Sequence, residues 1–150
     1  MLTRLTPEQI SKFWDVIKYA VEESLPPTVS DHPDKMNRIL SSALSGKTDV
    51  WASYTKNEKG NNFEGIGLTR ILYDDASGTK SFLLYCMYGY NKIDESSWVP
   101  VFDKLTKYAK SKGCSRIVAY SSVPHIIKMS KMLGAETDYT FISFDLNKTV

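Results

Sequence analysis

One run of ten residues, Ser81–Tyr90, constrains the fold of this chain more than any other. Its sequence, SFLLYCMYGY, is almost entirely apolar or aromatic. A strand of this composition has to be covered on both faces, so we expect it in the middle of a sheet. Its longest apolar stretch, Phe82–Tyr85, is far too short to cross a bilayer. The run therefore predicts a layered protein with helices packed against a sheet.

Two helices are expected before this sheet. A capping-box pattern at Thr6–Gln9, with proline in the first helical position, opens the first helix. Apolar residues then recur at helical spacing as far as Val21, and the Pro26-Pro27 pair ends the pattern. The second helix is expected over Met36–Leu44, with Gly46 as its C-terminal stop.

The remainder of the chain alternates between strand and helix patterns. Strands are expected at Val50–Tyr54, Phe63–Tyr73, Ser81–Tyr90, Arg116–Ser121 and Tyr139–Leu146, and helices at Ser97–Lys112 and Pro124–Leu133. Three consecutive strands predict an antiparallel meander, and the strand–helix–strand after it predicts a parallel crossover. The fold class is therefore α/β, a mixed sheet with helices on both faces, in a single domain over residues 1–150.

Charge and composition exclude several classes of function. The net charge is +2 and the 19 Lys and Arg are spread along the chain, which argues against a nucleic-acid partner. No signal-peptide core and no membrane-length apolar run occur, so a cytoplasmic location is expected. Cys86 and Cys114 lack the spacing of metal ligands and are expected to be reduced and buried; no other metal motif is present.

The order of elements resembles that of the GNAT acyltransferase superfamily. The resemblance covers nearly the whole chain and is most specific in the C-terminal half. There the helix Ser97–Lys112, a KGC turn and the strand Arg116–Ser121 precede the segment PHIIKMSKMLGAE, whose LGA is similar to the family's LGF. The resemblance implies a GNAT-like mixed sheet, with MLTRLT as a short first strand. In the family's enzymes, acetyl-CoA binds at an Arg/Gln-x-x-Gly-x-Gly/Ala signature after the third strand.

This chain departs from the family at that signature. Counted back from the KGC turn without a gap, the signature falls on IDESSW, which puts Ser96 and Trp98 at the glycine positions. Asp94 and Glu95 add negative charge where the pyrophosphate would bind. No glycine lies inside the range Gly89–Gly113, so no shift of register restores the signature. The two acids suit a helix N-terminus, where they take the place of a bound phosphate.

A second feature of the family is also missing. The same alignment places Val123 and Ser130 where many GNAT enzymes carry an asparagine and a proton-donating tyrosine. Serine is a poor proton donor for a departing thiolate, because the pKa of its hydroxyl lies far above the working range.

Two functions remain open. The favoured one is a GNAT-like protein with a degenerate acetyl-CoA site and no cofactor, which acts as a binding or structural protein rather than an enzyme. The alternative is a divergent acyl-CoA-dependent N-acyltransferase, an N-acetyltransferase in the family's sense. In that case Ser96, Ser97 and the backbone of Trp98 and Val99 would bind the pyrophosphate of acetyl-CoA.

The favoured function needs a partner, either another protein or a second copy of the chain. We expect it to bind around Tyr88, Tyr90, Asp94, Glu95 and Trp98, where the third strand and the following parallel strand separate. The acids would favour a basic partner segment, and tyrosine and tryptophan are frequent in binding hot spots. The chain also resembles, less specifically, GNAT-like bacteriophage virion and assembly proteins, which would place it in a virion.

The sequence also predicts the core. The residues expected to be largely buried are Trp14, Leu40, Leu84, Phe102, Leu105 and Ile117. Replacing Phe102 by alanine is expected to lower the free energy of unfolding by about 3–5 kcal/mol.

Overall fold

The computed structural model describes residues 1–90 and 95–148, apart from the side chains of Asn61 and Glu95. The chain divides into two compact units, Met1–Ala119 and Tyr120–Val150. The expectation of a single domain stays a prediction.

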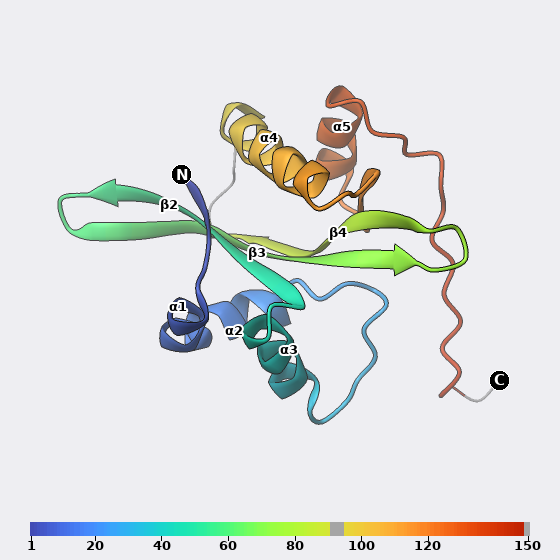
Figure 1. Cartoon of the computed structure of the whole chain (residues 1–150), viewed down its shortest axis with the longest axis horizontal. Coiled ribbons are helices and arrows are strands. Elements are labelled where there is room, and N and C mark those ends of the chain that lie inside the picture. Colours follow the sequence, from blue (N-terminus) through green and yellow to red (C-terminus); the bar gives the residue numbers. More distant parts are fainter. Residues whose placement is uncertain (91–94, 149–150) are drawn as a thin grey trace. The chain divides into compact units, whose positions relative to one another are not determined.

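The first unit contains one five-stranded sheet (Figure 1). Its strands are β1 (Leu2–Arg4), β2 (Thr48–Asn57), β3 (Gly60–Asp74), β4 (Thr79–Gly89) and β5 (Arg116–Ala119), which lie in this order across the sheet. Strands β1 to β4 pair antiparallel, and β5 pairs parallel to β4. The mixed sheet and its parallel crossover confirm the predicted α/β class, and β4 is an interior strand as its composition requires.

Helices cover both faces of this sheet (Figure 1). One face is covered by α1 (Pro7–Lys12), α2 (Trp14–Glu22) and α3 (Lys35–Leu44). The other face is covered by α4 (Glu95–Ser111). The last helix, α5 (Pro124–Met132), belongs to the second unit.

The start of α1 follows its sequence signal closely. The backbone N–H of Gln9 donates to Thr6 Oγ1 at 3.2 Å, and the backbone N–H of Thr6 donates to Gln9 Oε1 at 2.9 Å. This capping box satisfies two backbone donors that the first helical turn leaves without partners. The single helix expected here is interrupted at Phe13, whose φ of −104° separates α1 from α2.

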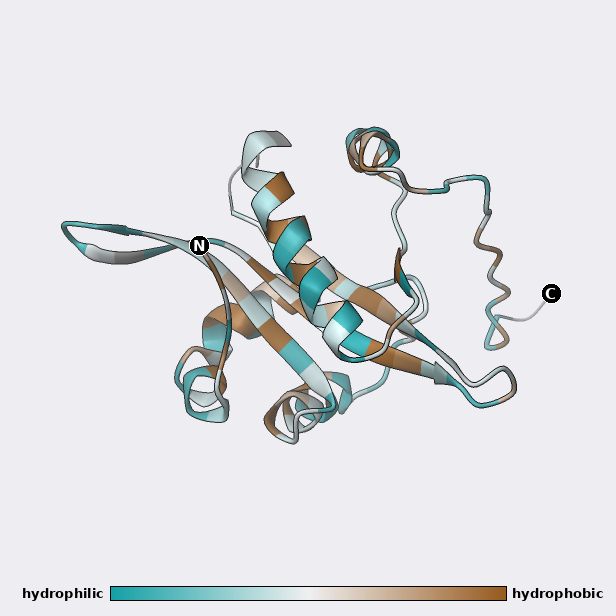
Figure 2. Cartoon of the chain, turned by 45° about the horizontal axis from the view of Figure 1, so that its top comes forward, coloured by the Kyte–Doolittle hydropathy of each residue, from teal (hydrophilic) through white to brown (hydrophobic). Residues whose placement is uncertain are grey.

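Two hydrophobic clusters hold the sheet to its helices, and Figure 2 shows the hydrophobic residues gathered along the middle of the strands. The cluster under α1–α3 consists of Leu5, Ile10, Ile17, Ala20, Val21, Ala43, Val50, Ala52, Ile66, Leu68 and Cys86. The cluster under α4 consists of Leu2, Trp51, Phe82, Leu105 and Ala109. Strands β2 and β4 thus contribute residues to both clusters, and β3 contributes Ile66 and Leu68 to the cluster under α1–α3.

The predicted core is confirmed in part. Leu105 is fully buried, whereas Trp14, Leu40, Leu84, Phe102 and Ile117 are half-buried. All of these except Phe102 pack on one of the two clusters. Its neighbour Val101 contacts the α4 cluster instead. The cost predicted for losing the Phe102 ring stays a prediction. The fully buried aromatic ring of this core is Phe82.

Polar contacts also fasten α4 to the first two strands. The hydroxyl of Tyr108 donates to Asp49 Oδ2 at 2.7 Å and accepts from Arg4 Nη1 at 2.7 Å. The ring of Tyr108 also lies edge-on to Trp51, with centroids 5.0 Å apart. Beneath it, Trp51 Nε1 donates to Thr69 Oγ1 at 2.9 Å, which satisfies two buried polar groups.

The second unit departs from the prediction at its end. Residues Tyr139–Leu146 form no strand and have no ladder partner in the part of the chain that the structure describes. Their apolar side chains are exposed, with Phe144 at 82% and Leu146 at 94%. The alternating pattern meets the side-chain requirement of a strand, but a strand also needs a neighbour for its backbone hydrogen bonds.

Candidate functional site

The two halves of β4 differ in their pairing. The first half pairs with β5 from Ser81 opposite Arg116 to Leu84 opposite Ala119, where β5 ends. From Tyr85 to Gly89, β4 keeps β3 as its single ladder partner within the described residues. Within the described residues, this side of β4 has no ladder partner from Tyr85 on, at the place where the sequence predicts that the parallel strands separate.

A β-bulge marks the boundary between these halves. Leu68 lies opposite Cys86 and Thr69 lies opposite Leu84, so that Tyr85 is an extra residue on β4. Because of this extra residue, even-numbered side chains before the bulge and even-numbered side chains after it point to opposite faces of the sheet. Tyr85, Tyr88 and Tyr90 therefore pack on the face of α1–α3, and so does the thiol of Cys86.

Three tyrosines come together at the open end of β4. The ring of Tyr88 lies edge-on to the ring of Tyr19 from α2, at 5.8 Å between centroids and 87° between planes. On its other side, Tyr88 is edge-on to Tyr90, at 5.1 Å and 85°. Edge-to-face contacts at these distances are favourable, because the positive edge of one ring meets the negative face of the next. We call Tyr19, Tyr88 and Tyr90 the tyrosine cluster.

The hydroxyls of Tyr88 and Tyr90 and the thiol of Cys86 keep their protons at neutral pH. A hydrogen bond to Tyr19, followed by burial and the nearby charge of Glu23, raises the pKa of Tyr88. Burial raises the pKa of Tyr90, and it raises the pKa of the Cys86 thiol to about 11. These groups are therefore protonated at neutral pH, and Cys86 is inert rather than a nucleophile.

The start of α4 carries the other residues that the sequence singles out. Ser96, Ser97 and Val99 are exposed in the first turns of the helix, and Trp98 is half-buried. The helix begins at Glu95 rather than at the predicted Ser97. Both serines therefore lie inside α4, and neither is its N-cap residue. Asp94 lies outside the described residues, as does the side chain of Glu95.

Only part of the predicted partner surface is brought together. Tyr88 and Tyr90 are in direct ring contact. No ring contact joins Trp98 to either of them in residues 1–90 and 95–148. Sequence reasoning missed Tyr19 and Glu23, because one exposed tyrosine and one acid on a helix give no signal until the helix packs on β4.

The second unit contains Val123 and Ser130, the two residues that the sequence resemblance aligns with the asparagine and tyrosine of GNAT enzymes. Val123 precedes α5 and makes no side-chain cap. The hydroxyl of Ser130 donates to the carbonyl oxygen of Ile126 at 2.8 Å, one turn earlier in the same helix. That hydroxyl is thus engaged with its own backbone. The expectation that it donates no proton in catalysis stays a prediction.

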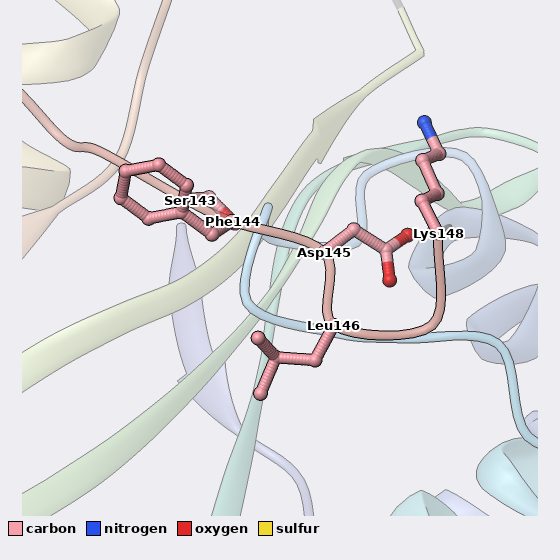
Figure 3. Close-up of a pocket in the computed structure, with 5 residues that line it drawn as sticks. All are labelled: Ser143, Phe144, Asp145, Leu146 and Lys148. Atoms are coloured by element: carbon pink, nitrogen blue, oxygen red, sulfur yellow. The ribbon is translucent and has the colours of Figure 1, made fainter. Parts of the chain in front are cut away.

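A shallow hollow lies in the C-terminal segment of this unit (Figure 3). It is lined by Ser143, Phe144, Asp145, Leu146 and Lys148. All five residues come from one short stretch of chain, so the hollow has no wall from a second element and presents no converging set of polar groups.

The described residues contain neither a candidate metal site nor a helix that could span a membrane. Within the described part of the chain, no group of three or more His, Cys, Asp or Glu side chains could hold a metal ion. Cys86 is buried and Cys114 half-buried, and both are free thiols. None of the helices described is long and apolar enough to span a membrane.

Comparison with solved structures identifies the fold. A probable acetyltransferase superposes with a TM-score of 0.69 at 12% identity, covering 100% of this chain and 99% of its own. A soil-metagenome aminoglycoside acetyltransferase in complex with sisomicin gives 0.70 at 14%, covering 98% and 96%. A predicted acetyltransferase with acetyl-CoA from Clostridium acetobutylicum gives 0.69 at 14%, covering 97% and 96%.

These likenesses show that the chain has the GNAT-like acetyltransferase fold. At 12–14% identity they show the fold alone. No protein-family model matches the chain, and no curated protein sequence matches it significantly.

Proposed function

We propose that this GNAT-fold protein binds a protein partner at the open end of β4 and does not use acetyl-CoA. The observation that carries this proposal is the first turn of α4, Glu95-Ser96-Ser97-Trp98. In this fold a pyrophosphate would approach the backbone N–H groups of that turn. None of these four residues is glycine, the residue that permits the closest approach of a phosphate to the backbone.

Charge supports the same conclusion. The sequence places Asp94 and Glu95 at the start of α4, and like charges disfavour a bound polyanion. The Ser130 hydroxyl, which bonds to Ile126, offers no replacement for the family's proton donor. An opening that keeps an unpaired strand edge and aromatic rings, but no phosphate site, suits a polypeptide partner.

The alternative function, a divergent N-acyltransferase, has one specific observation in its favour. The strand edge at Tyr85–Gly89 is unpaired in the described chain, and Ser96 and Ser97 lie exposed in the helix that follows. Hydroxyls and backbone donors there would have to bind the pyrophosphate against the local negative charge.

Calorimetric titration with acetyl-CoA separates the two functions. We expect no saturable heat at millimolar acetyl-CoA and no rise in melting temperature. A ligand at a hundredfold its dissociation constant would stabilise the protein by about 2.7 kcal/mol, which either method detects. A saturable heat together with a higher melting temperature, both absent with pantetheine as a neutral control, would establish the N-acyltransferase instead.

The partner site is tested by Trp98→Ala against Val99→Ala. Both positions lie in the first turns of α4, but Trp98 is half-buried and Val99 is 50% exposed. If Trp98 is a binding hot spot, Trp98→Ala should weaken the free energy of association with the protein partner by about 2 kcal/mol or more. Val99→Ala should have little effect on it. Equal association of both variants would place the interface elsewhere. The bacteriophage assignment stays a prediction.

A further inference from the structure

We propose that the outer edge of β1 and the adjoining side of α4 bind an extended acidic segment of a partner polypeptide. This surface is separate from the open end of β4, so the inference goes beyond the proposed function and does not depend on it. We call Arg4, Lys104 and Lys112, together with the ring of Tyr108, the basic stripe.

The first argument is a free strand edge. β1 is the outermost strand of the sheet and has β2 as its ladder partner. Just after β1, the backbone N–H of Leu5 donates to the carbonyl oxygen of Val50 in β2 at 2.8 Å. Because residues alternate in direction along a strand, the N–H and C=O groups of Leu2 and Arg4 point away from β2. Lys104 Nζ donates to the carbonyl oxygen of Leu2 from this side, and these backbone groups make no other bond in residues 1–90 and 95–148.

The second argument is an excess of positive charge beside this edge. Lys104, Tyr108 and Lys112 follow one another at four-residue intervals along one side of α4 and its last turn. The centroid of the Tyr108 ring lies 5.1 Å from the guanidinium carbon of Arg4 and 5.5 Å from the ammonium of Lys112. Asp49 supplies the one carboxylate found here among the described residues, 3.8 Å from Arg4 Nη1. Three cations therefore share one anion, and a further negative charge would be stabilised beside them.

The cations are accessible to a ligand. The side chain of Arg4 is 49% exposed, and Lys104 and Lys112 are exposed as well. Nη1 of Arg4 donates to the Tyr108 hydroxyl at 2.7 Å, while its other guanidinium donors have no partner in the described part of the chain. Those donors are free for the charge-assisted hydrogen bonds that arginine makes to carboxylates.

An extended polypeptide matches the spacing of these charges. The helical rise from Lys104 to Lys112 is about 12 Å. In an extended segment, every second side chain points the same way at intervals of about 6.6 Å, so three alternating acids span about 13 Å. The backbone of such a segment can pair with the free groups of Leu2 and Arg4, as a strand added to a sheet edge does.

A nucleic acid fits this surface less well. It has no amide backbone to pair with a strand edge. Single strands also need open aromatic faces on which bases stack. The Tyr108 ring is half-buried, with Trp51 and Phe82 edge-on to it at 5.0 and 5.8 Å between centroids. The surface therefore favours the carboxylates of a polypeptide.

The experiment uses acetyl-Glu-Gly-Glu-Gly-Glu-amide as the probe. Its neutral counterpart has glutamine in place of each glutamate, and tetrathymidylate carries the same number of negative charges on phosphodiesters. Binding to the full chain at low ionic strength is followed by the amide chemical shifts of ¹⁵N-labelled protein. We expect saturable shifts at Leu2, Arg4 and Lys112 with the glutamate peptide, weaker binding of tetrathymidylate and none of the glutamine peptide. Added salt should weaken the binding, because the cations are exposed.

Two variants each remove one charge of the basic stripe. Lys112→Gln and Arg4→Gln should weaken binding of the glutamate peptide by about twofold to fivefold, as expected for exposed ion pairs. Lys112→Gln removes no hydrogen bond or ion pair of the described chain, so it keeps the test valid if Arg4→Gln, which loses the bond to Tyr108, unfolds more easily.

Lys110→Gln is the matched control and should bind the peptide nearly as the wild type does. Lys110 is equally exposed on α4, but it lies two residues from Lys112 and so faces another side of the helix.

Four results would overturn the inference: no binding of the glutamate peptide, equal binding of the glutamine peptide, equal or tighter binding of tetrathymidylate, or equal losses in Lys110→Gln and Lys112→Gln. The basic stripe shares no residue with the partner surface proposed at the open end of β4. Its failure would therefore leave that function untouched, and binding of acetyl-CoA would leave the basic stripe untouched.

Discussion

The two halves of β4 share one strand but meet different surroundings. Thr79–Leu84 is paired with β3 on one side and, from Ser81, with β5 on the other, and it contributes Phe82 to the core under α4. Tyr85–Gly89 is paired on one side within the described residues, and three of its residues pack toward α1–α3. The bulge at Tyr85 separates these halves.

This difference separates the residues of β4 that stabilise the fold from those that could contact a binding partner. From Ser81 to Leu84 the closed half is paired on both edges, and Phe82 and Leu83 are buried. Within the described residues, the open half has a ladder partner on one edge, and its tyrosines are partly exposed. A chain can therefore keep the GNAT-like fold through its closed half while the chemistry at its open half changes.

The largest expected effect tests the closed half. Phe82→Ala should lower the free energy of unfolding by about 3–5 kcal/mol, since it empties a fully buried site. Met87→Ala, in the open half and 37% exposed, should cost no more than about 1 kcal/mol. Urea unfolding of both variants gives the two values. Similar losses would mean that the halves do not differ in packing.

The next effect concerns the buried thiol in the open half. Burial raises the pKa of Cys86 from its ordinary value of 9.0 to about 11, so the folded state keeps the proton that the unfolded state releases. The contribution of the protonated thiol to the free energy of unfolding is complete below pH 9. It falls by at most about 2–3 kcal/mol as the pH rises from 9 to about 11.

Comparing wild type with Cys86→Ala measures this contribution together with the part of the raised Tyr85 pKa that the Cys86 charge causes. The raised pKa values of Tyr88, Tyr90 and Tyr108 act in the same direction in both proteins. The free energy of unfolding, measured by urea at pH 8 and pH 11, should fall more steeply in the wild type. Parallel pH profiles would indicate that the thiol reaches solvent.

A smaller effect tests how α4 is held over the closed half. Tyr108→Phe removes a hydroxyl that accepts from Arg4 and donates to Asp49, which should cost about 1–2 kcal/mol. Tyr73→Phe, at an exposed tyrosine, should stay within about 0.5 kcal/mol of wild type. If the two variants unfold at the same urea concentration, the hydroxyl network contributes nothing to stability.

Most of the first unit could be predicted from the sequence. Apolar periodicity and punctuation by glycine and proline located α3, β2 to β5 and α4 within a few residues. Gly46, with a φ of 82°, follows the end of α3, as expected. Gly134, with a φ of 94°, follows the end of α5. These signals are local, and the final structure obeys them because each also agrees with the packing around it.

The features that could not be predicted depend on contacts between distant segments. The bulge at Tyr85 carries no glycine or proline and follows from the register of β3 against β4. The tyrosine cluster needs α2 to pack on β4 before Tyr19 reaches Tyr88. The strand expected at Tyr139–Leu146 failed for the same reason, since side-chain alternation alone supplies no backbone partner.

The central claim is that the open half of β4 and the start of α4 no longer form an acetyl-CoA site. The most direct test is a titration of ¹⁵N-labelled protein with acetyl-CoA, followed at the amides of Tyr85–Gly89 and Ser96–Val99. The account predicts that neither segment shifts at millimolar acetyl-CoA. Saturable shifts in both segments, with one common dissociation constant, would contradict it and show that the unpaired strand edge and the first turn of α4 still bind the cofactor together.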